Sequence, residues 1–181
     1  MTKSIKLNAS NILSIKKKID QEITKYSHII REENVMSNKA IAAGKGSGFD
    51  LKSLYNTIQQ LRNKRIMLKG MIQYLNIGLT KFNYDEFKKT NYYAIFSACE
   101  AKEDITLLKM IKTLDPKTKA QKGKKALSQK ETFSKEKITQ LIHDQQLEAN
   151  KFDAMLEKFN TNNGIEIDEN NTDSFKEYLA A

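Results

Sequence analysis

Few residues of this 181-residue chain could act as soft metal ligands or activated nucleophiles. His28, His143 and Cys99 are its only histidines and cysteine, and no two of them stand at a spacing typical of metal ligands. A dimetal carboxylate bundle would need Glu three residues before His, and the residue three before His143 is Gln140. No histidine stands near a serine or cysteine in a recognisable nucleophile motif. We therefore expect no metal site, no cofactor, no small-molecule substrate and no enzymatic activity.

The segment Ala43–Gly48, AGKGSG, superficially resembles a phosphate-binding loop. Such a loop has the pattern G-x-x-x-x-G-K-[ST] between a strand and a helix, because successive backbone N–H groups must surround the phosphates. Here Lys45 is followed by Gly46, no glycine precedes Gly44 at the required distance, and no strand is expected before it. The segment is therefore predicted to be a flexible connector.

Three carboxylates, Glu100, Glu103 and Asp104, fall within five residues. Neighbouring carboxylates can perform general acid–base catalysis when their pKa values are driven apart. On an exposed helical turn, however, such a group is more often solvated. We expect these three side chains to face water.

The strongest pattern is an apolar repeat with alternating steps of three and four residues, which places one narrow stripe along a helix. It predicts a helix over 51–77 that packs against another helix, with Asp50 as its N-cap. Because an isolated two-helix hairpin buries little, this seam is expected to meet the fourth helix or another subunit. The seam consists of Leu51, Leu54, Ile58, Leu61, Arg65, Leu68, Ile72, Leu75 and Leu79.

Arg65 is the one charge in this seam. A charge at such a position reduces stability unless it is paired, and its best-attested use is to fix helix register or partner number. Its partner could be Glu22 on the first helix or an acid of another subunit. Alternatively, the arginine stem lies along the stripe while the guanidinium reaches water.

Two further helical regions flank the seam. Isoleucines at steps of three or four predict a first helix over 10–32, capped by Asn8 or Ser10. A third region is predicted from Asn83 to Leu114, with a break around Thr90–Tyr92 or near Glu100–Glu103, and it ends before Pro116.

The spacing Ser128-x-x-Glu131 fits a capping box and predicts a fourth helix over 131–160. No strand pattern competes with these helices, apart from a short extended piece at Ile165–Ile167. The predicted fold is all-α: an elongated helical bundle built on an antiparallel coiled-coil-like hairpin. Its predicted parts are residues 1–114, a basic linker or loop at 115–130, the fourth helix, and an acidic tail at 161–181 with a short terminal helix.

The densest group of aromatic residues lies between Phe82 and Phe96, interleaved with lysines. Such rings could stack on nucleic-acid bases or anchor a partner protein. The simpler prediction is that they seal the corner between the second and third helices.

The chain carries a formal net charge of +9, whereas residues 161–181 contain five acids and one lysine. A basic body suggests a polyanion partner. Only three of the 31 basic residues are arginine, however, and abundant Lys, Asn and Ile also follow from an A/T-rich genome. The linker could contact phosphates, be solvated, or pair with the acidic tail. The candidate polyanion contacts are Lys117, Lys119, Lys122, Lys124 and Lys125.

From these patterns we expect a non-enzymatic structural, scaffolding or adaptor protein. It would act through helix–helix contacts in a homo-oligomer, with another helical protein, or in a phage or viral assembly. The alternative is a nucleic-acid-associated accessory protein that uses the linker lysines. No run of 18 apolar residues and no signal-like N-terminal run occurs. The expected location is therefore the cytoplasm or the interior of a larger particle, without a membrane partner.

Overall fold

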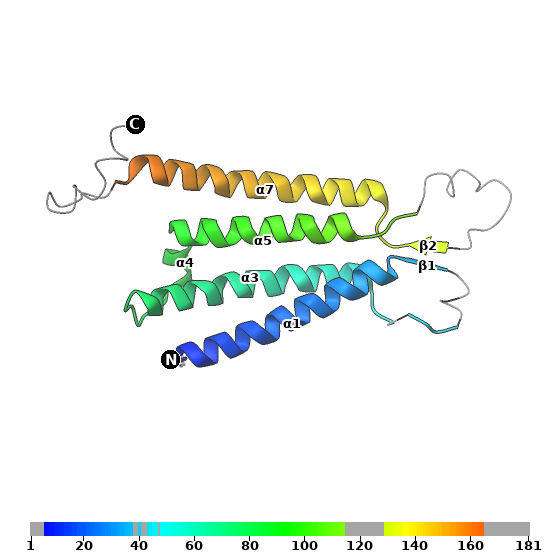
Figure 1. Ribbon diagram of the computed structural model, residues 1–181, viewed down its shortest axis with the longest axis horizontal. Helices are drawn as coiled ribbons and strands as arrows, with labels where there is room; N and C mark the ends of the chain where they lie inside the picture. Colours follow the sequence, from blue (N-terminus) through cyan, green and yellow to red (C-terminus); the bar gives the residue numbers. More distant parts are fainter. Residues whose placement is uncertain (1–5, 38–39, 41–42, 47, 115–128, 165–181) are drawn as a thin grey trace, which may run out of the picture.

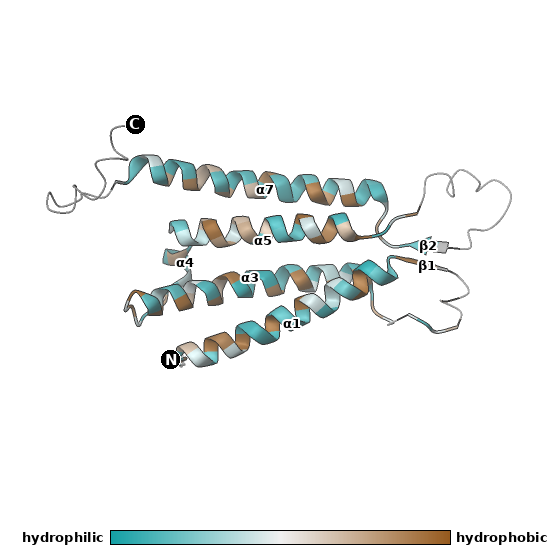
Figure 2. Cartoon of the chain, in the orientation of Figure 1, coloured by the Kyte–Doolittle hydropathy of each residue, from teal (hydrophilic) through white to brown (hydrophobic). Residues whose placement is uncertain are grey.

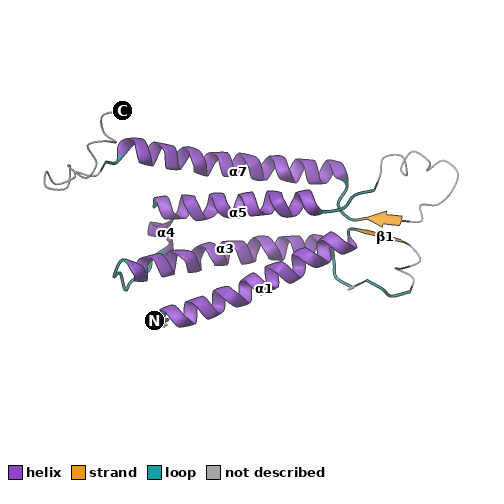
Figure 3. Cartoon of the chain, in the orientation of Figure 1, coloured by secondary structure: helices purple, strands orange, loops and turns teal. Residues whose placement is uncertain are grey.

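The computed structural model describes residues 6–37, 40, 43–46, 48–114 and 129–164. Helices dominate these residues (Figure 3), so the all-α prediction is confirmed for the described part of the chain. The elements follow in the order α1 (Ala9–Glu33), β1 (Val35–Ser37), α3 (Leu51–Asn76), α4 (Tyr84–Phe87), α5 (Asn91–Met110), β2 (Gln129–Glu131) and α7 (Lys135–Asn162). The linker lysines and the piece Ile165–Ile167 lie outside the described residues, as does most of the acidic tail.

The four long helices lie side by side in the order α7, α5, α3 and α1, each antiparallel to the next (Figure 1). The closest pairs are α1 with α3 and α5 with α7, while α3 and α5 approach less closely. Hydrophobic and hydrophilic residues alternate around each helix (Figure 2), which is the pattern of a bundle with wet outer faces.

The helices α1 and α3 begin where their caps predict. The side chain of Asn8 accepts a hydrogen bond from the Asn11 amide, and that of Asp50 accepts one from the Lys52 amide. Both side chains thereby satisfy a backbone donor that the first turn leaves free. The core between the two helices is formed chiefly by Ile12, Ile19, Ile23 and Ile30 with Leu51, Leu54, Ile58 and Leu61.

The C-terminal end of α3 is set by Gly78, which has a φ of +80°. This left-handed conformation lets the amide of Leu79 donate to the carbonyl of Tyr74 at 2.8 Å. Leu79 therefore lies beyond the helix and is 47 % exposed. Its assignment to the packed seam is wrong, because the chain turns before reaching it.

Aromatic rings fill the corner formed by α3, α4 and α5. The ring of Phe87 is fully buried and lies 5.7 Å from Tyr93 and 6.2 Å from Tyr74, between ring centroids. The predicted packing role of this aromatic group is thus confirmed. The predicted break in the third region lies at Thr90, whose side chain caps α5, and α5 continues through Glu100–Glu103.

A two-stranded ribbon joins the two interhelical connections at one end of the bundle. β1 pairs antiparallel with β2, with Val35 opposite Glu131. The fourth helix consequently begins later than its predicted start at residue 131, with Ser134 as its N-cap. The predicted capping box from Ser128 is wrong, because Glu131 belongs to the ribbon and its carboxylate accepts from the Leu114 amide.

Asn34 fixes this end of the bundle. Its side chain is fully buried and donates to the carbonyls of Lys112, at 2.7 Å, and Phe133, at 2.9 Å. Its carboxamide oxygen accepts from the Phe133 amide at 2.7 Å. One side chain after α1 thus holds together the segment that follows α5 and the segment that precedes α7.

Candidate functional site

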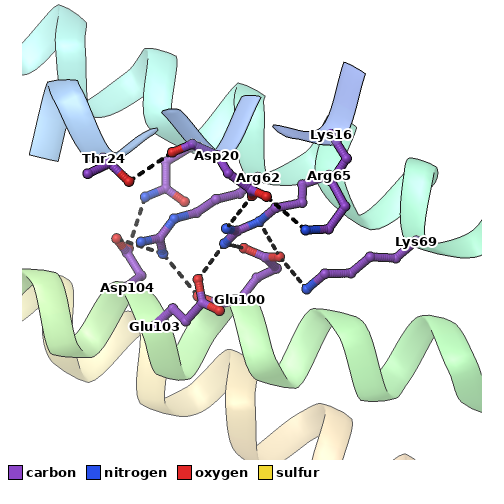
Figure 4. Close-up of polar contacts among 10 residues, drawn as sticks. Lys16, Asp20, Thr24, Arg62, Arg65, Lys69, Glu100, Glu103 and Asp104 are labelled. Carbon is purple, nitrogen blue, oxygen red and sulfur yellow. Dashed lines mark hydrogen bonds and ion pairs between the residues drawn. The ribbon is translucent and has the colours of Figure 1, made fainter. Parts of the chain in front are cut away.

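A cluster of eight charged side chains lies across the three helices α1, α3 and α5 (Figure 4). It contains four cations and four carboxylates, so its formal charge is balanced. We call it the charge cluster. Its members are Lys16 and Asp20 of α1, Arg62, Arg65 and Lys69 of α3, and Glu100, Glu103 and Asp104 of α5.

Arg65 links all three helices. Its Nε donates to Glu100 Oε1 at 2.7 Å, and its Nη2 contacts the second oxygen of Glu100 and the carboxylate of Glu103. Its Nη1 donates to Asp20 Oδ1 at 3.1 Å. A planar guanidinium engaged by three carboxylates can adopt few other orientations, so this residue fixes the relative position of the helices.

The expectations for Arg65 are corrected accordingly. Glu22 is exposed and makes no contact with it, because residue 22 points away from the face of α1 that Asp20 occupies. The guanidinium is also largely shielded from water rather than extended into it, since the residue is only 8 % exposed. The carboxylates that pair with Arg65 all come from its own chain.

A second buried ion pair, between Arg62 and Asp104, lies beside the contacts of Arg65. Arg62 Nη1 is 2.9 Å from Asp104 Oδ1 and donates to the backbone carbonyl of Glu100. Asp104, which is fully buried, also accepts from the hydroxyl of Tyr55 at 2.6 Å and from the amide of Gln59 at 2.9 Å. Such partners are what a buried carboxylate requires.

For the ionisable groups of the charge cluster, burial and pairing with an opposite charge shift the pKa in opposite directions. Burial raises the pKa of the Asp104 carboxyl, although the charge of Arg62 opposes this shift. Burial and the neighbouring Asp104 also raise the pKa of the Tyr55 hydroxyl. Burial alone would lower the pKa of the Arg65 guanidinium, but its bonds to Glu100 raise it above the ordinary value.

Two lysines complete the charge cluster at its edges. Lys69 Nζ lies 2.9 Å from Glu100 Oε1, and Lys16 Nζ lies 2.8 Å from Asp20 Oδ2. Partial burial would raise the pKa of Asp20, but the contacts with Lys16 and Arg65 lower it overall. Each of the two carboxylates therefore faces two cations.

The prediction that Glu100, Glu103 and Asp104 face water is wrong for two of the three. Glu100 and Asp104 are buried, and only the side chain of Glu103 is half exposed, at 52 %. α5 lies between α3 and α7, so it buries more than one face. The cations of α3 and the acids of α5 both recur at helical spacing, but nothing in the sequence indicates that these two faces meet.

The remaining seam residues pack within the chain. Leu51, Leu54, Ile58, Leu61 and Leu68 are buried in the core, and Ile72 and Leu75 are half-buried against it. Within the chain, the seam thus meets α1, α5 and the start of α7. The linker residues Lys117, Lys119, Lys122, Lys124 and Lys125 lie outside the described residues.

The candidate metal ligands and nucleophiles of the sequence do not come together in the structure. Cys99, His28 and His143 are each exposed. Within residues 6–37, 48–114 and 129–164, no three metal-ligating side chains come together, and no helix is long and apolar enough to cross a bilayer. What the described residues do bring together is the charge cluster, whose geometry suits holding helices in register.

Comparison with known proteins adds no relative: no protein family, no curated protein and no solved structure matches this chain.

Proposed function

We propose that this chain is a non-enzymatic scaffold or adaptor that self-associates through helix–helix contacts. In this role the bundle is a fixed frame, and the outer face of α7 provides the surface that binds a second copy. A structural component of a larger assembly, such as a phage or viral particle, fits the same role.

The charge cluster supports the first half of this proposal. Arg65, Glu100 and Asp104 are buried and take partners from neighbouring helices, so a shift of one helix against another would leave a charge unpaired. Uncompensated buried charge is strongly unfavourable, whereas the hydrophobic effect is non-directional and discriminates less between alternative helix positions. The charge cluster therefore favours one arrangement of α1, α3 and α5, which is what a scaffold needs.

The exposed side chains of α7 support the second half, and this is the observation on which the proposal rests most. Of its 28 residues only Ile138 and Ala149 are buried. Leu147 is 56 % exposed, and Met155 and Phe159 are each 41 % exposed. Their spacing places them within about 120° of arc on the helix, a sector that a partner helix could cover.

Light scattering after size exclusion tests the proposal. We expect the wild-type chain to show a multiple of the monomer mass and to dissociate on dilution. The triple variant Leu147→Ser, Met155→Ser, Phe159→Ser should remain helical by circular dichroism and be monomeric at the same concentrations.

The matched control replaces three exposed polar residues of the same helix, Gln146→Ser, Asn150→Ser and Glu157→Ser. It should keep the wild-type mass, because its positions carry no apolar contact. A wild-type chain that is monomeric throughout the dilution series would contradict self-association through α7.

The net charge of +9 favours a second function, contact with a nucleic acid through the linker lysines. In a gel-shift assay, changing Lys117, Lys119, Lys122, Lys124 and Lys125 to Gln should then abolish a salt-sensitive complex. Changing the exposed lysines Lys17, Lys18, Lys52, Lys64 and Lys109 to Gln gives the control of equal charge. Absence of a complex at low salt would eliminate this alternative.

A further inference from the structure

α7 lies at one edge of the row of helices, with α5 packed most closely against it (Figure 1). The exposed apolar residues of its outer side do not stand alone. At about 100° per residue, the sector of α7 that contains Leu147, Met155 and Phe159 also contains four exposed charged residues. These charged residues are Asp144, Glu148, Lys151 and Lys158.

The charges of this sector follow a simple order, in which both acids precede both lysines. Glu148 and Lys151 lie 3.9 Å apart, and their side chains are 52 % and 65 % exposed. Within the part of the chain that the structure describes, Asp144 and Lys158 have no ion-pair partner. The sector is therefore acidic toward the start of α7 and basic toward its end, and its charged groups are accessible to a partner.

This order of charges distinguishes between the two ways in which a second copy can lie against the sector. In a parallel pair of α7 helices, Glu148 would face Glu148 and Lys158 would face Lys158. In an antiparallel pair, the acidic half of each helix faces the basic half of the other. Because like charges placed side by side are unfavourable and opposite charges attract, the antiparallel orientation is preferred.

The apolar residues fix the register of such a pair. They extend from Leu147 to Phe159, about 18 Å along the helix. Two antiparallel copies cover both stretches completely only when residue 153 of one lies level with residue 153 of the other. Leu147 is then level with Phe159 of the second copy, and Met155 is level with Lys151, whose methylene stem can pack over it. The same register places Glu148 level with Lys158.

We propose that two copies of this chain pair through α7 in antiparallel orientation, about a two-fold axis level with residue 153, with Glu148 of each copy opposite Lys158 of the other. This inference rests on the proposed function and adds its geometry. A two-fold contact uses the same surface of both copies, so it closes at two. Assembly beyond a dimer would need a second surface.

Charge reversal tests the pairing of Glu148 with Lys158. Each of the variants Glu148→Lys and Lys158→Glu introduces two pairs of like charges into the dimer. Each should raise the dissociation constant about tenfold, as measured by light scattering over a dilution series. The double variant Glu148→Lys, Lys158→Glu restores opposite charges and should associate within about threefold of the wild type. Circular dichroism verifies that every variant remains helical.

Glu157→Lys is the matched control, since it makes the same change of charge at an exposed position of α7 outside the sector. It should associate as the wild type does. Parallel pairing would leave both single variants unchanged, because like charges already meet in it. That result, or a double variant that associates no better than the single variants, overturns the antiparallel contact.

Disulfide formation tests the register without altering the apolar residues. In a Cys99→Ser background, Asp144→Cys in one copy and Asn162→Cys in the other lie level and should form a disulfide when the two proteins are mixed and oxidised. Mass spectrometry of the joined peptides identifies the bond. Neither variant alone should form one, because equal positions lie about 27 Å apart along the antiparallel helices.

The two measurements separate the contact from the proposed function. A wild-type chain that is monomeric at every concentration contradicts self-association, and the antiparallel contact with it. A wild-type dimer that joins position 144 to position 144, or that gives no disulfide between 144 and 162, overturns the orientation and register proposed here while self-association stands.

Discussion

Arg65 of α3 and Glu100 of α5 form a buried two-pronged ion pair, with Nε donating to Oε1 at 2.7 Å and Nη2 contacting Oε2. Both residues are less than 10 % exposed. The pair stands where an apolar residue would continue the seam of α3. A shift of either helix along the other would break this pair and leave a buried charge without its partner.

Replacing Arg65 alone with Leu should lower the free energy of unfolding by about 3–5 kcal/mol, because Glu100 stays buried with only Lys69 as a partner. Urea denaturation followed by circular dichroism measures the loss. The double variant Arg65→Leu, Glu100→Leu should recover most of it, since Lys69, Asp20 and Glu103 can still reach water. Lys64→Leu on the exposed face serves as the control, and a double variant no more stable than Arg65→Leu would contradict this interpretation.

Gly70 marks the closest approach of α3 to the aromatic corner. A Cβ built at this position would lie 2.6 Å from Cζ of Phe87. Gly70→Ala should therefore destabilise the protein by about 1–3 kcal/mol, even though alanine is the better helix former by about 1 kcal/mol. The measurement is thermal unfolding, with Asn63→Ala as the control on α3. If Phe87→Leu fails to reduce the penalty of Gly70→Ala, steric contact with the ring is not its cause.

Substitution of Asn34 should reduce the stability of the protein more than substitution of most other polar residues. Asn34→Ala removes the donor to two carbonyls and the acceptor for the Phe133 amide, so we expect a loss of about 3 kcal/mol. Hydrogen exchange should become faster at the Phe133 amide in particular. The exposed Asn56→Ala offers a comparison on α3 and should leave that amide protected. Unchanged exchange at Phe133 in Asn34→Ala would show that the ribbon holds this end without the side chain.

Asp20 makes the stability of the fold depend on pH in the acid range. Its contacts with Lys16 and Arg65 lower its pKa in the folded state, so its contribution to stability is present above the unfolded pKa of about 3.9 and is lost as the pH falls through the folded pKa. Asp20→Asn should reduce stability at neutral pH by less than about 1 kcal/mol, since the side chain is partly exposed. Urea midpoints measured between neutral and acid pH should converge for the two proteins as the pH falls. A difference that persists or grows in acid would show that the charge of Asp20 is not responsible.

The sequence predicts the long helices well and the polar contacts poorly. α1 and α3 follow from isoleucine and leucine spacing and from the caps Asn8 and Asp50, all of which are local signals. The ribbon could not be predicted, because its strands have three residues each and the partners of Asn34 lie 78 and 99 residues away. Three-residue strands carry no alternation that a pattern could detect.

Only one member of the charge cluster could be singled out from the sequence. Arg65 stands out because the seam around it is apolar, whereas Arg62 lies beside the seam, where a charged residue is ordinary. On α5 the buried positions lie on more than one face, so Glu100 and Asp104 resemble the acids of an exposed turn. Their burial follows from the position of α5 between two other helices, which only the three-dimensional arrangement shows.

The most direct test of self-association uses the chain's single cysteine. Cys99 is exposed on α5, so one spin label can be attached to each copy. A singly labelled chain gives a dipolar signal in pulsed electron paramagnetic resonance only when two copies lie close together. We predict such a signal for the wild-type chain and its loss in the variant Leu147→Ser, Met155→Ser, Phe159→Ser. No signal from the wild type, or a signal that the variant retains, would contradict a scaffold that assembles through α7.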